Sequence, residues 1–394
     1  MSRSIALAPA LAPLLRLART RFRPAAPARP RRPAAGAALP VIEETALERE
    51  AATQEAQGLF LARQERWDEL DTLVRSCDRR RAALPDGQPV AQRLALGAAS
   101  DVLWTAEAGF DTDERMRRTG CGVAQLEDAL AAHPRAPGVA LVLVHTHLSL
   151  GWAARREAAT EPARPEARAA LHAHLARAGQ ILDRFAEAAG DSAAFAAARC
   201  LQLPARRPGP EARARAYLDL VARDPANPRH LRDMGRSLLP RRTGTLATLE
   251  RAAREAAALS EAKLGPAGYF WAHMDALAED ERVFERLDLE WFLAGLDAAA
   301  ARHGDQHAAN TVAAFCALTM APHHGRARLN PAIAPRRAAV HDRAPGVCRD
   351  HLHEIHPLVW AETAAAIGPE RPVPPRPRRV AEGTALARAA LAAA

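Results

Sequence analysis

The sequence has little of what supports sheets, disulfide frameworks or zinc sites. Its 394 residues include only 22 glycines and two tyrosines, and β-branched residues rarely occur in runs. The cysteines are odd in number, widely spaced and without a CxxC pair: Cys77, Cys121, Cys200, Cys316 and Cys348. These absences argue against a sheet-based fold, a disulfide framework and a structural zinc site. They favour a reducing compartment, so we expect a cytoplasmic protein.

Long apolar runs are missing as well, since none approaches the roughly 18 residues that cross a bilayer. We therefore expect no transmembrane segment. The first 24 residues combine a basic residue with a short apolar run, but Pro9 and Pro13 interrupt that run and Arg16 and Arg19 follow it. A secretory signal is therefore disfavoured. The other interpretations are an Arg-rich targeting peptide and, favoured by the composition, a disordered tail or an over-extended start.

Lysine is almost absent, because Lys263 is the only one, and arginine carries the net charge of +8. Residues 1–42 hold eight arginines and no acidic residue, so residues 43–394 sum to zero. The folded part therefore lacks the basic surface of a nucleic-acid-binding protein. We expect no sequence-specific nucleic-acid recognition, and only weak contact of residues 1–42 with anionic surfaces.

What the sequence does contain is a helix-forming mixture of alanine, leucine, arginine and glutamate. In residues 165–188 the apolar positions recur at helical spacing and share one face. The patterns predict an all-α fold of roughly 13–15 helices. The clearest predicted helices cover 89–108, 122–132, 138–157, 165–188, 267–279, 281–301, 306–320 and 347–366, with breaks at Gly120-Cys121-Gly122 and at Pro357.

Composition divides the chain into three parts. Residues 1–42 are a basic, Pro/Ala/Arg-rich tail, which we predict to be disordered, and residues 43–368 form the helical domain. Residues 369–394 are predicted as a Pro-rich linker and a marginal helix, with Pro372–Arg379 in a polyproline-type conformation.

Residues 211–259 show the organisation of that domain best. An apolar helix ends at Asp224-Pro225, and a second helix follows Asn227-Pro228 and carries Gly235 on its apolar stripe. A glycine there predicts that two helices approach closely. Residues 126–145 repeat the pattern of residues 218–235, with Pro-x-x-Pro between two apolar helices. Such hairpins cannot bury their apolar faces alone, so we predict stacked antiparallel hairpins.

The same junctions resemble tetratricopeptide-type repeats. Two sets of residues carry this resemblance: Tyr217, Leu220, Pro225, Leu231, Met234, Gly235 and Leu238, and more loosely Leu126, Ala129, Pro134 and Leu143. The junctions lie 91 residues apart, from Pro134 to Pro225, which is no multiple of the family period of about 34. The order of residues 152–155, helix 165–188 and loop 243–245 is also similar to a bacterial family of degenerate helical repeats of unknown function, over roughly residues 45–365. The resemblance implies an α-solenoid and transfers no catalytic residue.

Histidines give the main metal-binding candidate. His351, His353 and His356 lie in HLHEIHP beside Glu354, and His353 and His356 would share a face of the predicted helix. The order is HEIH and not the HExxH of metalloproteases. A metal site also needs a third ligand and supporting contacts, so the structural interpretation is favoured and no cofactor is expected.

Two further candidates lie in helix 138–157. His145 and His147 point about 200° apart on a helix, which predicts a hydrogen-bonded core histidine paired with a neighbouring helix rather than a shared ligand site. Trp152, Arg155 and Arg156 offer an aromatic plane and fixed donors for an acidic or aromatic group of a partner. The alternative, which we favour, is a core tryptophan with arginines paired to nearby glutamates.

Motifs of familiar enzymes are absent: there is no G-x-S-x-G, no Walker loop and no GxGxxG. The sequence therefore predicts a helical-repeat scaffold that binds a protein or peptide, with Trp152, Arg155 and Arg156 as its candidate binding residues. The alternative is an enzyme or metal-binding protein whose site lies between helices near the C-terminal histidines.

Overall fold

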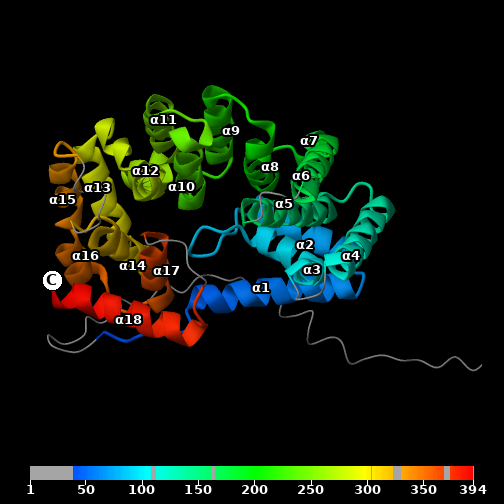
Figure 1. Cartoon of the computed structure of the whole chain (residues 1–394), viewed down its shortest axis with the longest axis horizontal. Coiled ribbons are helices and arrows are strands. Elements are labelled where there is room, and N and C mark those ends of the chain that lie inside the picture. The colour runs from blue at the N-terminus through cyan, green and yellow to red at the C-terminus, as the bar shows by residue number, and fades with distance from the viewer. Residues whose placement is uncertain are drawn as a thin grey trace, which may run out of the picture. The chain divides into compact units, whose positions relative to one another are not determined.

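The computed structural model describes residues 39–107, 112–160, 165–302, 304–322, 330–367 and 373–393. These residues form helices joined by turns, with isolated β-bridges in place of strands, which confirms the all-α prediction (Figure 1). The expectations for residues 1–38 lie outside the described residues.

The first half of the described chain surrounds one apolar core. Its helices are α1 (Ala46–Arg63), α2 (Trp67–Arg79), α3 (Val90–Glu107), α4 (Thr112–Ala132), α5 (Pro137–Thr160), α6 (Pro165–Arg184), α7 (Ala186–Ala189) and α8 (Ala193–Arg206). Helix α1 packs on α3, α3 packs on α5, and α5 packs on α6. Phe195 and Ala198 of α8 complete this core, whereas Ala193 and Cys200 of α8 belong to the second one.

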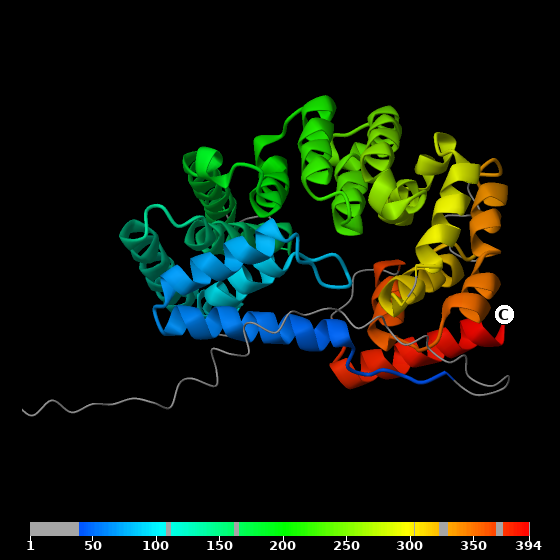
Figure 2. The same ribbon diagram turned by 180° about the vertical axis from the view of Figure 1, so that it is seen from behind.

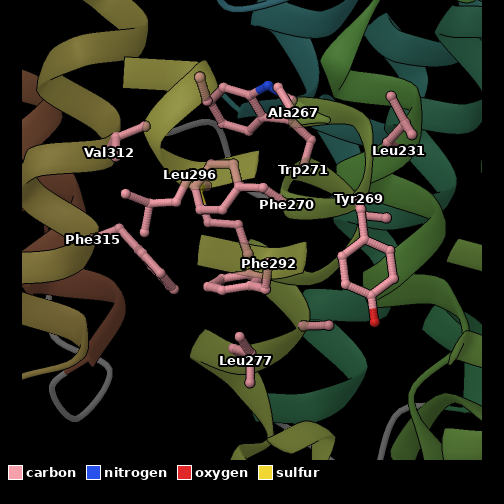
Figure 3. Packing of buried hydrophobic residues seen from close by; sticks show 14 of the residues in the cluster. Leu231, Ala267, Tyr269, Phe270, Trp271, Leu277, Phe292, Leu296, Val312 and Phe315 are labelled. Carbon is pink, nitrogen blue, oxygen red and sulfur yellow. The ribbon is translucent and has the colours of Figure 1, made fainter. Parts of the chain in front are cut away.

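The second half surrounds the larger core. Its helices are α9 (Pro210–Arg223), α10 (Pro228–Ser237), α11 (Leu246–Leu264), α12 (Ala267–Glu279), α13 (Leu289–Ala300), α14 (Gln306–Ala314), α15 (Ala334–His341), α16 (Ala344–His351), α17 (Pro357–Ile367) and α18 (Arg376–Ala392). Figure 3 shows Phe270, Phe292 and Phe315 packed at its centre, with Phe270 and Phe292 ring centroids 5.2 Å apart.

Side-chain caps fix where several helices begin. Thr45 and Glu48 form a capping box at α1, in which each side chain bonds the backbone N–H of the other residue. The Ser192 hydroxyl accepts from Phe195 N at α8, and Asp305 accepts from Ala308 N at α14. These bonds satisfy N–H groups that the helices leave unpaired.

Gly235 confirms the predicted close approach of two helices. It lies in α10 against α12, and a Cβ built there would be 1.9 Å from the carbonyl oxygen of Ala272. The helices can touch at this point only because the glycine has no side chain.

Two predicted boundaries are wrong and one predicted break is confirmed, and more helices form than predicted. Gly120-Cys121-Gly122 lies inside α4, whose flanking residues favour a helix. Residues 281–301 divide into a 3₁₀ turn (Glu281–Glu285) and α13, which Asp288 caps. The predicted break at Pro357 is confirmed: residues 347–366 divide into α16 and α17, and Pro357 stands at the first position of α17, where no N–H is needed.

The polyproline segment expected at 372–379 also ends early. Helix α18 begins at Arg376 with Pro375 as its N-cap residue. It packs on α17 and α16, which supplies the stabilisation that an isolated alanine-rich helix lacks.

Among the described residues, α5 is the one helix that is long and apolar enough to be a candidate membrane span. Its stretch Pro137–Ala154 has a mean hydropathy of 1.2, long and apolar enough to cross a membrane by length and composition. However, 83% of that stretch is buried inside the protein, as expected for a core helix.

The first described residues lie against the last helices. Val41 forms a parallel bridge with Ile355, in which Ile42 N donates to Ile355 O at 2.9 Å and Ile355 N donates to Pro40 O at 2.8 Å. Arg376 of α18 binds the carboxylate of Glu48 in α1 and donates to the carbonyl of Glu43 at 2.5 Å. Figure 2 shows this segment running along α18.

Candidate functional site

The predicted binding residues Trp152, Arg155 and Arg156 lie on α5. Trp152 is partly buried and packs against the N-terminal core. The side chains of the two arginines lie outside the described residues, so the predicted recognition surface stays a prediction.

The C-terminal histidines do not share a helix face. His351 ends α16, whereas His353 and His356 lie in the extended segment before α17. His356 Nε2 is 2.8 Å from the carboxylate of Glu354. In the parts of the chain that the structure describes, no three histidine, cysteine or acidic side chains are placed to hold a metal ion together.

This segment is held by two amides of α14. Gln306 Nε2 donates to His351 O at 3.0 Å, and its Oε1 accepts from His353 N at 2.8 Å. The Asn310 amide is fully buried and bonds Glu354 O, His356 N and the indole of Trp360. This histidine-rich segment is therefore a connection between α16 and α17 whose backbone is held in place by hydrogen bonds from α14.

Replacing Asn310 with leucine is expected to destabilise the protein by about 3 kcal/mol, because several buried polar groups then lose their partner. Urea unfolding followed by circular dichroism measures this change. Gln57→Leu, at an exposed position of α1, is the control and should change stability by less than about 0.5 kcal/mol. Equal stabilities of the two variants would contradict the role given to Asn310.

His147 confirms the predicted pairing of a core histidine with a neighbouring helix. Its Nδ1 lies 2.9 Å from Nδ1 of His174 on α6, and its Nε2 lies 3.5 Å from the carboxylate of Glu127 on α4. Burial, together with the charge of His174, lowers its pKa to about 4 against the opposing effect of Glu127. Burial also lowers the pKa of His145 to about 4. Both are neutral core groups at neutral pH.

A small polar cavity lies where the loop between α2 and α3 meets α10, α12 and α14. Asp86, Arg232, Trp271, Asp305 and His307 are among its lining residues, and its volume is about 20 Å³. That volume holds a water molecule, but metabolite sites are roughly 300–1,000 Å³. The convergence of charged groups here is therefore not a substrate site.

A larger open groove of about 620 Å³ lies between the first described segment and α18. Val41 and Glu43 line one side. The other side is one face of α18, formed by Arg376, Pro377, Val380, Ala381, Thr384, Ala385 and Arg388. These positions recur every three or four residues, so they align along the helix. The centre of the groove is apolar and its ends are charged.

The side of α18 that adjoins the groove is packed against the rest of the protein. A Cβ at Gly383 would be 1.9 Å from the carbonyl oxygen of Pro357, so α18 lies directly on the start of α17. Ala387 is fully buried in the same contact layer. Sequence reasoning missed the groove, because residues 369–394 show no amphipathic pattern strong enough to identify a packed helix.

The groove offers binding surface rather than catalytic groups. Glu43 is the one carboxylate among its lining residues, and no histidine or cysteine accompanies it. General acid–base chemistry needs positioned groups of matched pKa, which the lining does not supply. No family model, no curated protein and no solved structure matches this chain.

Proposed function

We propose that the protein is a cytoplasmic helical-repeat scaffold that binds a protein segment in the groove between residues 39–45 and α18. The observation that carries this proposal is the groove itself, at about 620 Å³ and open to solvent. Interfaces typically combine an apolar centre with a polar rim, and this groove has both.

The packing of the helices supports a tetratricopeptide-like arrangement. The junctions α4–α5 and α9–α10 each turn at the Pro-x-x-Pro sequences that resemble one another. Helices α9 and α11 pack together, as do α10 and α12, so successive hairpins contact through equivalent helices. Stacking of this kind leaves extended surfaces that repeat proteins use for binding. All five cysteines are free thiols, in keeping with a reducing compartment.

The test is affinity capture from the native host followed by mass spectrometry. Ala385→Trp places a large ring in the groove, and we expect it to reduce recovery of the specific partner at least about tenfold, equivalent to about 1.4 kcal/mol. Ala389→Trp adds the same ring at an exposed position of α18 outside the groove lining. Equal recovery with both variants would refute the groove as the binding site.

A further inference from the structure

We propose that the segment bound in this groove is α18 of a second copy of the chain, packed antiparallel about a two-fold axis. This inference rests on the proposed function, since it names the partner of the same groove. The groove is complementary in charge to itself, and the side chains in its middle are small and apolar.

One end of the groove is acidic. Arg376 is already neutralised by its hydrogen-bonded ion pair with Glu48. Two more carboxylates, those of Glu43 and Glu44, lie near enough to act on the same guanidinium. Both are exposed, and within the described chain Glu43 forms no ion pair. Among the described residues, this end holds the carboxylates of Glu43, Glu44 and Glu48. The guanidiniums here are those of Arg376 and of Arg49, which donates to the carbonyl of Glu44, so the described groups sum to a net negative charge.

The other end is basic. Arg388 is exposed and forms no ion pair with any residue that the structure describes. The arginines earlier on α18 differ in this respect, because Arg378 pairs with Glu382 and Arg379 lies 3.6 Å from the carboxylate of Glu362. Arg388 is thus the cation of the groove that lacks a partner among the described residues.

The spacing of these ends fits a symmetric helix pair. Arg376 and Arg388 are twelve residues apart on α18, which is about 18 Å along a helix axis. A two-fold axis near the midpoint brings Arg388 of each protomer to the Glu43 end of its partner. Ala381 and Ala385 then lie near the axis, where small side chains permit helices to pack about 8–10 Å apart.

Self-complementarity favours a second copy over an unrelated segment. In a two-fold interface the same patch faces itself, so it must carry both charges at matched distances from the axis. A helix pair of this length covers less than the roughly 1,200 Å² of a stable interface. We therefore expect a reversible dimer with a dissociation constant on the order of 10 μM.

The experiment is analytical ultracentrifugation of the full chain from about 1 to 200 μM, a range that brackets the expected constant. The parent protein should shift from monomer to dimer. Arg388→Glu and Glu43→Arg should each weaken dimerisation at least about tenfold, because each places like charges opposite one another. The double variant carrying both substitutions should recover to within about threefold of the parent. Arg251→Glu, an exposed α11 position outside the groove lining, changes the net charge as Arg388→Glu does and should have no effect.

A monomer at the highest concentration overturns the inference, and so does a dimer that neither charge reversal weakens. If the chain is monomeric but Ala385→Trp still abolishes capture of another protein, the proposed function stands and only the identity of the partner is wrong. If the chain is monomeric and capture is also unchanged, both proposals fail.

Discussion

Between pH 7 and pH 4 the folded state is expected to lose about 6 kcal/mol of stability through His145 and His147 alone. Burial, aided at His147 by the charge of His174, lowers the pKa of each side chain from the ordinary value of 6.5 to about 4. Each pKa unit corresponds to about 1.4 kcal/mol, so each histidine contributes about 3 kcal/mol.

The sign follows from the lowered pKa. The unfolded chain takes up protons below pH 6.5, while the buried rings resist protonation until the pH approaches 4. The stabilisation is therefore complete above pH 6.5 and is lost as the pH falls toward 4. The geometry around His147 has the same consequence, because two Nδ1 atoms at 2.9 Å share one hydrogen, and a second proton between them would be repelled.

Urea unfolding at several pH values between 7 and 4 measures this loss. His145→Leu removes one buried titrating group, so the decrease across this range should shrink by about 3 kcal/mol. His172→Gln is the control, because His172 is exposed on α6, and its curve should follow that of the parent. If the parent and His145→Leu show the same pH dependence, the assignment to buried histidine is wrong.

Gly235→Leu is expected to destabilise the protein by about 4 kcal/mol or more, near the upper limit for a single substitution. A Cβ at this position would meet the backbone carbonyl of Ala272, and a carbonyl in a helix cannot turn aside as a flexible side chain can. Helices α10 and α12 would have to separate, which would disturb the larger core around Phe270 (Figure 3).

Thermal and urea unfolding of Gly235→Leu test this expectation. Gly120→Leu is the matched control, because Gly120 is an exposed position inside α4 where an added Cβ would have no neighbouring atom within 4 Å. Leucine there should raise stability by up to about 1 kcal/mol through helix propensity. A Gly235→Leu protein as stable as the parent would show that the two helices are not in direct contact.

The candidate site shows why contacts between distant segments escape a single sequence. Val41 and α18 line the same groove although more than 330 residues separate them. The sequence predicts that a core histidine of this helix pairs with a neighbouring helix. It does not predict that the partner of His147 is His174. Periodicity reports which face of a helix is buried, whereas it does not report which helix covers that face.

The sequence by itself determined the local structure of this protein. Helix-forming composition, apolar spacing and Pro-x-x-Pro turns predict an all-α chain of hairpins, and the glycine at position 235 predicts a close helix contact. These features act over one or a few turns, so neighbouring residues are enough to specify them. Residues 281–301 are divided by the local cap at Asp288, a signal that is also present in the sequence.

Only the tertiary structure decided the groove and the connections around it. Helix α18 is a weak helix alone, and its contact with Pro357 through Gly383 stabilises it, while the adjoining side that lines the groove stays open. The segment 352–356 is extended because the amides of Gln306 and Asn310 satisfy its backbone. Burial and hydrogen bonding between distant segments outweigh local propensity at these positions, and that is why the site depends on the complete fold.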